Sequence, residues 1–186
     1  MTAAHCFGGS GVHPASEASV GNQYTTTWTG SLDAYGDWKL LYGSTYANHV
    51  FSGAISGPTM SSSLPIVGIN WNPLAIGSGL CTSGRTTGQI CRYWVKGTTL
   101  RRKIEGYWIR HLVWLRHDGT APYDGEDSDG FRPGDSGGPC YYNNGSGGMI
   151  GAGTMTAENG SGGGYLFHCT QVSGLKAWPG GSSASF

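Results

Sequence analysis

The chain has 186 residues, no net formal charge, a charged fraction of 12% and 34 glycines. A neutral chain predicts no polyanionic partner, since nucleic-acid binding needs a basic stripe, and no run of 18 apolar residues is present that could span a membrane. We therefore expect neither nucleic acid nor a membrane as a partner. Abundant glycine with few helix-forming residues favours many short strands joined by turns.

Segments in which apolar and polar residues alternate recur between clusters of Gly, Ser and Asn, a pattern typical of an all-β barrel. The expected strands cover 24–32, 38–42, 49–55, 91–96, 107–115, 148–156 and 165–172. One helical segment is expected over 172–178. The basic run Arg101-Arg102-Lys103 is interpreted as a solvated strand end.

The low-complexity stretch 56–64 has the composition of a linker, and it predicts a domain boundary. Residues 1–63 are expected to form a first unit and residues 64–178 a second. Residues 179–186 follow a Pro-Gly-Gly sequence that cannot continue a helix, and we expect them to form a disordered tail.

Two short motifs carry the chemistry. Residues 134–139 read GDSGGP, with Ser136 between glycines, and residues 2–6 read TAAHC, with His5. A serine hydroxyl is a poor nucleophile at neutral pH and needs a base such as histidine to take its proton. Ser136 is therefore predicted as a nucleophile and His5 as its general base. The glycines would allow a tight turn in which the backbone N–H groups of Gly134 and Ser136 form an oxyanion hole.

TAAHC followed by GDSGGP resembles the trypsin/chymotrypsin-like serine proteases. Residues 83–88, which read SGRTTG, and the glycine-rich segments resemble the bacterial streptogrisin-like branch of that family. The resemblance covers residues 5–178. It implies two antiparallel six-stranded β-barrels, the N-terminal one incomplete here, and peptide-bond hydrolysis through an acyl-enzyme on Ser136. It also implies a polypeptide substrate, a monomer, and neither a cofactor nor a metal.

The third member of such a triad is a carboxylate between His5 and Ser136 in sequence, which fixes the imidazole tautomer. The candidates are Asp33 and Asp37. Asp37 opens Asp-Trp-Lys-Leu-Leu, which is similar to the family pattern, whereas Asp33 opens a turn-like Asp-Ala-Tyr-Gly. Asp37 is therefore favoured.

Five cysteines are an odd number for a secreted chain. Cys81 and Cys91 flank a short loop with turn residues, and Cys140 and Cys169 fall on strands expected to be neighbours, so two disulfides are predicted. In the family the partner of Cys6 lies upstream of the histidine. We therefore expect a fragment of a secreted protein, trimmed at both ends, with its signal peptide upstream of Met1. Five free thiols in a cytosolic protein remain the alternative.

The family's specificity pocket implies substrate contacts at Gly130 and at Thr154, Met155 and Thr156, although Asp129 stands one residue from the position an acidic pocket floor needs. Asp135 is expected to pair with a cation, for which Arg85 and Arg132 are candidates.

Three alternatives to an active endopeptidase stay open: a non-catalytic homologue that acts as a binding module, an esterase that uses the same triad, and an inactive fragment. Because the strands that anchor His5 in the family are missing, the chain itself is expected to show little activity.

Overall fold

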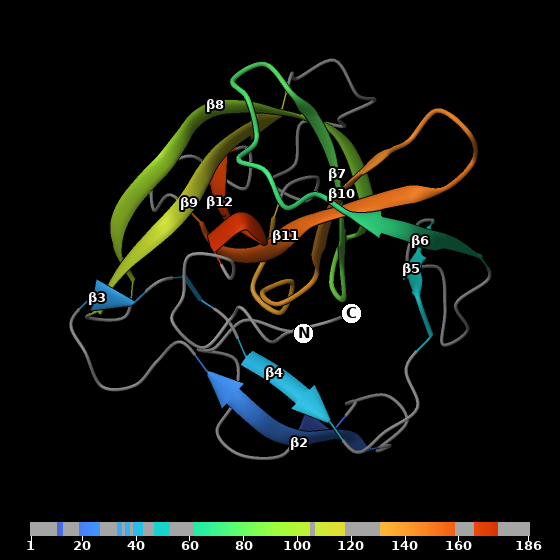
Figure 1. Ribbon diagram of the computed structural model, residues 1–186, viewed down its shortest axis with the longest axis horizontal. Helices are drawn as coiled ribbons and strands as arrows, with labels where there is room; N and C mark the ends of the chain where they lie inside the picture. The colour runs from blue at the N-terminus through green and yellow to red at the C-terminus, as the bar shows by residue number, and fades with distance from the viewer. Residues whose placement is uncertain are drawn as a thin grey trace.

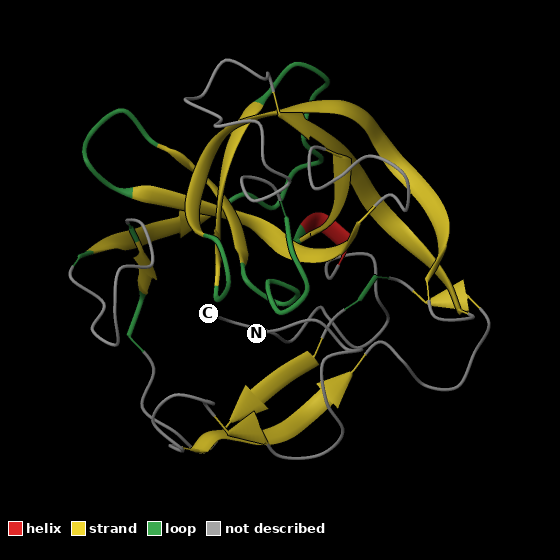
Figure 2. Ribbon diagram, turned by 180° about the vertical axis from the view of Figure 1, so that it is seen from behind, coloured by secondary structure: helices red, strands yellow, loops and turns green. Residues whose placement is uncertain are grey.

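The structure is a computed structural model. It describes residues 11–12, 19–26, 33–34, 36–37, 39–42, 47–52, 62–104, 107–117, 131–158 and 166–174. These residues are almost entirely β-structure, with one helical turn at Ser173–Gly174 after the last strand (Figure 2). In the described part of the chain, no helix is long and apolar enough to cross a membrane.

Six antiparallel strands of the C-terminal part form a closed ring (Figure 1). The order is β10-β7-β8-β9-β12-β11, and pairing of β10 with β11 closes it. Closure gives each of the six strands a neighbour on both sides over part of its length, which leaves little edge for unwanted strand addition. The strands are β7 (Gly79–Gly84), β8 (Gly88–Ile104), β9 (Tyr107–His117), β10 (Pro139–Asn143), β11 (Met149–Glu158) and β12 (Leu166–Gln171).

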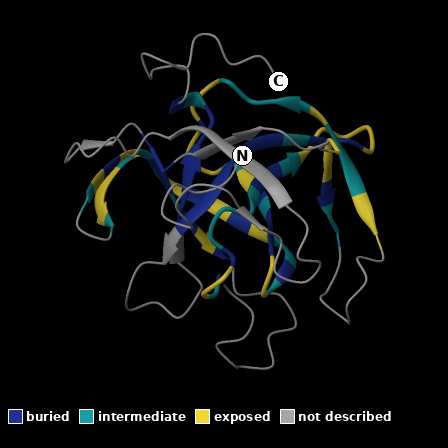
Figure 3. Ribbon diagram, turned by 90° about the horizontal axis from the view of Figure 1, so that it is seen from below, coloured by how far each residue is buried: buried dark blue, intermediate teal, exposed yellow. Residues whose placement is uncertain are grey.

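The ring closes because one face of each strand is apolar. On β8, Tyr93 and Val95 are fully buried while the residues between and beside them are exposed, as a period of two requires. Strands β11 and β12 differ, since residues 151–156 and 168–171 are buried without a break, and buried residues gather in the middle of the molecule (Figure 3). The main core is the set of buried residues Leu74, Leu80, Tyr93, Val95, Val113, Leu115, Phe131, Cys140, Ala152, Met155 and Cys169.

The N-terminal part forms a separate three-stranded antiparallel sheet in the order β1-β2-β4 (Figure 1). Its strands are β1 (Gly11–Val12), β2 (Ser19–Thr26) and β4 (Lys39–Tyr42). Two further pairings join early segments to the ring. Strand β3 (Asp33–Ala34) pairs in parallel with β9, and β6 (Ser63–Ile69), itself paired with β5 (His49–Phe51), runs parallel to β11.

Several strand predictions need correction. The stretch 56–64 was expected to be a linker, but its last two residues begin β6, which a parallel neighbour on β11 holds in place. Strand β7 was not expected, and β10 was expected only as the strand on which Cys140 falls, because both strands are short and bordered by Gly, Ser or Pro. Strand β8 runs to Ile104 rather than stopping near Lys96, since β9 pairs with it along its length. Of the expected helix over 172–178, only residues up to 174 are described.

Two disulfides join the expected cysteines. Cys81–Cys91 links β7 to β8 with Cα atoms 3.9 Å apart, and Cys140–Cys169 links β10 to β12 with Cα atoms 6.7 Å apart. The second bridge crosses β11 at Gly153, where a Cβ atom would come within 2.6 Å of the Cys169 sulfur. Glycine is therefore required beneath this disulfide. Cys6 lies outside the described residues.

Candidate functional site

Ser136 stands on a tight turn immediately before β10. The turn is made by two consecutive backbone hydrogen bonds, from Asp135 N–H to the Arg132 carbonyl (3.0 Å) and from Gly138 N–H to the Asp135 carbonyl (2.9 Å). Gly134 and Gly137 have φ values of 98° and 84°, which favour glycine. The turn therefore explains why glycines surround the serine.

The same turn is docked onto β11. Gly137 N–H donates to the Met155 carbonyl at 2.8 Å, and Met155 N–H donates to the Gly138 carbonyl at 2.8 Å. A Cβ atom on Gly138 would overlap the Ser83 carbonyl oxygen of β7, so the close approach of this turn to the barrel also needs glycine. The half-buried Ser136 hydroxyl lies 3.3 Å from the Thr156 carbonyl, to which it donates.

The buried Asp135 carboxylate holds this turn against the β7–β8 hairpin. One oxygen accepts the backbone N–H groups of Thr86 (2.7 Å) and Thr87 (3.1 Å). The other accepts the Thr87 hydroxyl (2.9 Å) and the Arg132 backbone N–H (2.9 Å). The carboxylate thus has four donors, as a buried anion requires.

The donors on Asp135 correct one expectation from the sequence. A cation was expected there, but within the described part of the chain neither Arg85 nor Arg132 presents its guanidinium to the carboxylate. Arg132 takes part through its backbone alone. Backbone N–H groups can hold a carboxylate in its charged form without a counter-ion.

Glycine and threonine residues allow the two loops to interlock. A Cβ atom on Gly84 would overlap the Asp135 carboxylate, and one on Gly134 would come within 2.6 Å of the Thr86 hydroxyl oxygen. That hydroxyl donates to the Pro133 carbonyl at 2.9 Å. The SGRTTG sequence was interpreted only as a resemblance to the family, and the roles of Thr86 and Thr87 were not predicted. The signal available was the hydroxyl-rich turn itself.

Asp37 is completely buried, as a triad carboxylate must be. It follows β3, whose backbone pairs with β9 at Asp33 opposite Trp108, and it precedes β4. The other candidate, Asp33, takes part in that strand pairing. His5 and Gly130 lie outside the described residues, so the structure places Asp37 and Ser136 but does not describe the predicted base.

Of the predicted substrate contacts, Thr154, Met155 and Thr156 all lie on β11 and are buried, with exposed fractions of 2%, 1% and 1%. Met155 belongs to the main core, and the Thr156 hydroxyl pairs with that of Thr170 at 2.6 Å. The side chains at these three positions are buried, so the expected contact with a substrate would be made by backbone groups.

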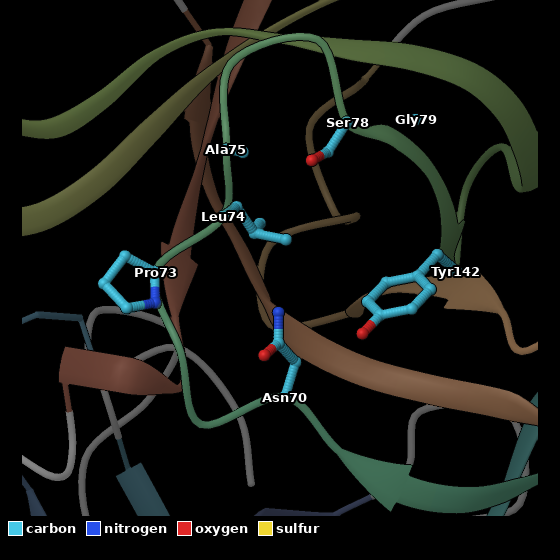
Figure 4. Close-up of a pocket in the computed structure, with 7 residues that line it drawn as sticks. All are labelled: Asn70, Pro73, Leu74, Ala75, Ser78, Gly79 and Tyr142. Carbon is cyan, nitrogen blue, oxygen red and sulfur yellow. The ribbon is translucent and has the colours of Figure 1, made fainter.

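One surface pocket of about 390 Å³ lies at the start of β7 and the end of β10 (Figure 4). None of the predicted site residues lines it. Its lining consists of Asn70, Pro73, Leu74, Ala75, Ser78, Gly79 and Tyr142. In the described part of the chain, no group of three or more His, Cys, Asp or Glu residues could hold a metal ion.

No family model and no curated protein matches the sequence. Solved structures do match. A glutamic acid-specific serine protease, described as using a histidine triad in substrate binding, superimposes with a TM-score of 0.68 at 18% identity, over 95% of this chain and 81% of that one. Chymotrypsin from Cellulomonas bogoriensis superimposes with a TM-score of 0.64 at 19% identity, over 95% of this chain and 80% of that one. The chain has the trypsin-like serine protease fold.

A Nocardiopsis protease of the same fold gives a TM-score of 0.62 at 20% identity, over 95% of this chain and 80% of that one. The match to these trypsin-like proteases confirms the all-β double-barrel architecture expected from the two motifs, with the C-terminal barrel closed. At these identities the likeness shows the fold, and the chemistry must be argued from this chain's own residues.

Proposed function

We propose that this protein is a secreted serine endopeptidase that hydrolyses polypeptides through an acyl-enzyme on Ser136. His5 takes the Ser136 proton as general base and returns it to the leaving amine. Asp37 orients the imidazole and stabilises its positive charge. The backbone N–H groups of Gly134 and Ser136 stabilise the oxyanion of the tetrahedral intermediate.

The turn around Ser136 is the observation that carries this proposal. Asp135, with four donors, fixes the backbone on both sides of the oxyanion loop, and Gly137 and Gly138 fix it against β11. Among the described residues, the Gly134 N–H donates to no protein acceptor, as a group reserved for an oxyanion should. Removing one such donor from a protease costs about 2.7–4 kcal/mol of transition-state stabilisation.

We further propose that residues 1–63 form the unit that carries His5 and Asp37, and residues 64–178 the unit that carries Ser136, with 179–186 as a tail. The active site then lies between the units. The two disulfides support a secreted protein, because such bridges persist in oxidising compartments.

We propose that the substrate backbone binds along β11 as an added strand, with Gly130 at the pocket wall. Pairing of β11 with β10 ends at Thr154, whereas pairing with β12 continues to Glu158. One edge of the segment Thr156–Glu158 therefore has no strand neighbour among the described residues. Backbone hydrogen bonds from this edge need no exposed side chain, which agrees with the burial of Thr154, Met155 and Thr156.

Hydrolysis of a peptide amide by the full-length gene product tests the proposal. Ser136→Ala should abolish turnover. Asp37→Asn should lower kcat by about four orders of magnitude because the imidazole takes the wrong tautomer. Asp33→Asn is the matched control, and it should keep most of the activity. Equal losses in the two Asp variants, or hydrolysis of esters without any hydrolysis of amides, would contradict an endopeptidase that uses Asp37.

A further inference from the structure

The positive charge of this neutral chain is concentrated on one hairpin. Strands β8 and β9 carry seven of the eleven Lys and Arg residues and no Asp or Glu. All seven side chains are exposed: Arg92, Lys96, Arg101, Arg102, Lys103, Arg110 and Arg116. Figure 1 shows the two strands side by side as a long curved pair on the flank of the barrel. Net charge alone hides this hairpin, because acidic residues outside the two strands, including Glu105 between them in the sequence, balance its charge.

Three of these cations, Arg92, Lys96 and Arg116, form a first group, the barrel cluster, around the exposed indole of Trp94. Arg92, Trp94 and Lys96 alternate with buried Tyr93 and Val95, so they share the outer face of β8. Trp94 is directly opposite Arg116 on β9. The ring is 38% exposed, and its carbons lie 3.3–3.6 Å from the place a Gly79 Cβ would take, so the indole packs against the backbone of β7.

A second group, the tip cluster, repeats this arrangement near the end of the hairpin. Trp108 is 39% exposed and is directly opposite Lys103. The Arg101 guanidinium lies over the Trp108 ring at 4.6 Å from its centroid. Arg110 is two residues along the strand, with the buried Ile109 between, so it shares the face of Trp108. Each cluster is thus one indole with three cations.

We propose that this hairpin binds an acidic polysaccharide, a chain of pyranose rings that bear carboxylate or sulfate groups. The cations pair with the acidic groups, and guanidinium groups do so in a bidentate manner. The indoles supply flat apolar surface for the sugar rings. Trp94 and Lys103 are nine positions apart on β8, at most about 30 Å of strand, so only an extended polymer is long enough to reach from one cluster to the other.

Two observations favour a polysaccharide over a nucleic acid. The disulfides indicate an oxidising, extracellular environment. Each indole also has a neighbour on it already, Gly79 in one cluster and Arg101 in the other, so neither ring forms one side of an open slot into which a base could insert. A ring that lies on the surface suits the flat face of a pyranose.

Binding of fluorescent polygalacturonate to the Ser136→Ala protein, measured by anisotropy over a range of salt concentrations, tests the proposal. Lys96→Gln/Arg116→Gln should weaken binding about tenfold or more and reduce the slope of log K against log salt. Lys39→Gln/Arg85→Gln removes the same charge outside the hairpin and should leave affinity and slope nearly unchanged. Circular dichroism should show the fold intact in both.

Replacing the indole of Trp94 tests a separate part of the proposal. Trp94→Leu should weaken binding while leaving the salt slope unchanged, because no charge is lost. The proposal is overturned if the protein fails to bind polygalacturonate, if the control pair weakens binding as much as the hairpin pair, or if Trp94→Leu has no effect. Tighter binding of an oligothymidylate at the same salt concentration would also overturn it, since the partner would then be a nucleic acid.

Discussion

Asp135→Asn removes one carboxylate oxygen from the site that holds the oxyanion loop. An amide offers one acceptor and two donors, so it cannot face all four groups that now donate to Asp135. The Thr87 hydroxyl can rotate to accept from the new NH₂ group, but the Arg132 backbone N–H cannot. One buried N–H is therefore left without an acceptor, and the hydrogen bonds that remain lose the charge of the carboxylate.

The magnitude follows from these contacts. A hydrogen bond to a charged group contributes about 1.5–3 kcal/mol, and a neutral one about 1. Asp135→Asn loses one such hydrogen bond and weakens two others, and the lower cost of desolvating a neutral amide offsets part of this loss. The free energy of unfolding should therefore fall by about 2–4 kcal/mol. Catalysis should fall by about 10²–10³ in kcat if one oxyanion donor is displaced.

Urea unfolding of the oxidised protein measures the first effect and single-turnover hydrolysis the second. Thr87→Val removes one donor at constant shape and should cost about 1–3 kcal/mol. Thr98→Val, whose hydroxyl has no hydrogen bond within the described part of β8, should stay within about 0.5 kcal/mol of the parent. If Asp135→Asn is as stable and as active as Thr98→Val, the carboxylate does not hold the loop.

Three further predictions concern other positions. Asp37→Asn should lower the rate at which an organophosphonate modifies Ser136 by orders of magnitude. The midpoint of urea unfolding should change by no more than a few tenths of a molar unit. Equal labelling rates in the variant and the parent protein would exclude Asp37 from the triad. Burial, aided by the charge of Arg110, lowers the pKa of His111 below its ordinary 6.5. As pH falls, the His111 imidazole is therefore protonated in the unfolded chain before it is protonated in the folded protein, and the free energy of unfolding should decrease below about pH 6.5. His111→Asn, in which asparagine tolerates the φ of 57°, should make the free energy of unfolding depend less on pH in urea melts taken between pH 5 and 8. Gly153→Ala should destabilise the oxidised protein by about 1–3 kcal/mol because the methyl group meets the Thr170 carbonyl oxygen and the Cys169 sulfur, and an unchanged melting temperature would mean that β12 and its disulfide do not pack this closely on Gly153.

Much of the barrel could be predicted from the sequence, because strands with one buried face alternate apolar and polar residues. This holds for the segments that became β8, β9, β11 and β12. Strands β7 and β10 carry no such signal, since Gly79–Gly84 and Pro139–Asn143 are short and their conformation is set by neighbouring strands. Strand β6 contains Pro65, which argues against a strand until its partners are known.

The candidate site, too, could be predicted from the sequence only in part. Ser136 could be predicted because its turn needs glycines that appear in the sequence, and Asp37 because an apolar strand follows it. The donors on Asp135 could not, because three of the four are backbone N–H groups, two of them in a hairpin about fifty residues away, and a backbone group has no sequence signature. The edge of β11 proposed to bind substrate likewise depends on where the pairing with β10 stops, which is a property of the register.

The most direct test of the account is the mass-spectrometric location of a covalent label. The full-length gene product is incubated with a peptidyl organophosphonate at pH 7.5, digested, and the adduct is mapped. A single adduct on the peptide that contains Ser136, absent in Ser136→Ala and after denaturation, is the result the account predicts. A folded protein that takes up no label, or that carries the label at another residue, would contradict the assignment of Ser136 as the nucleophile.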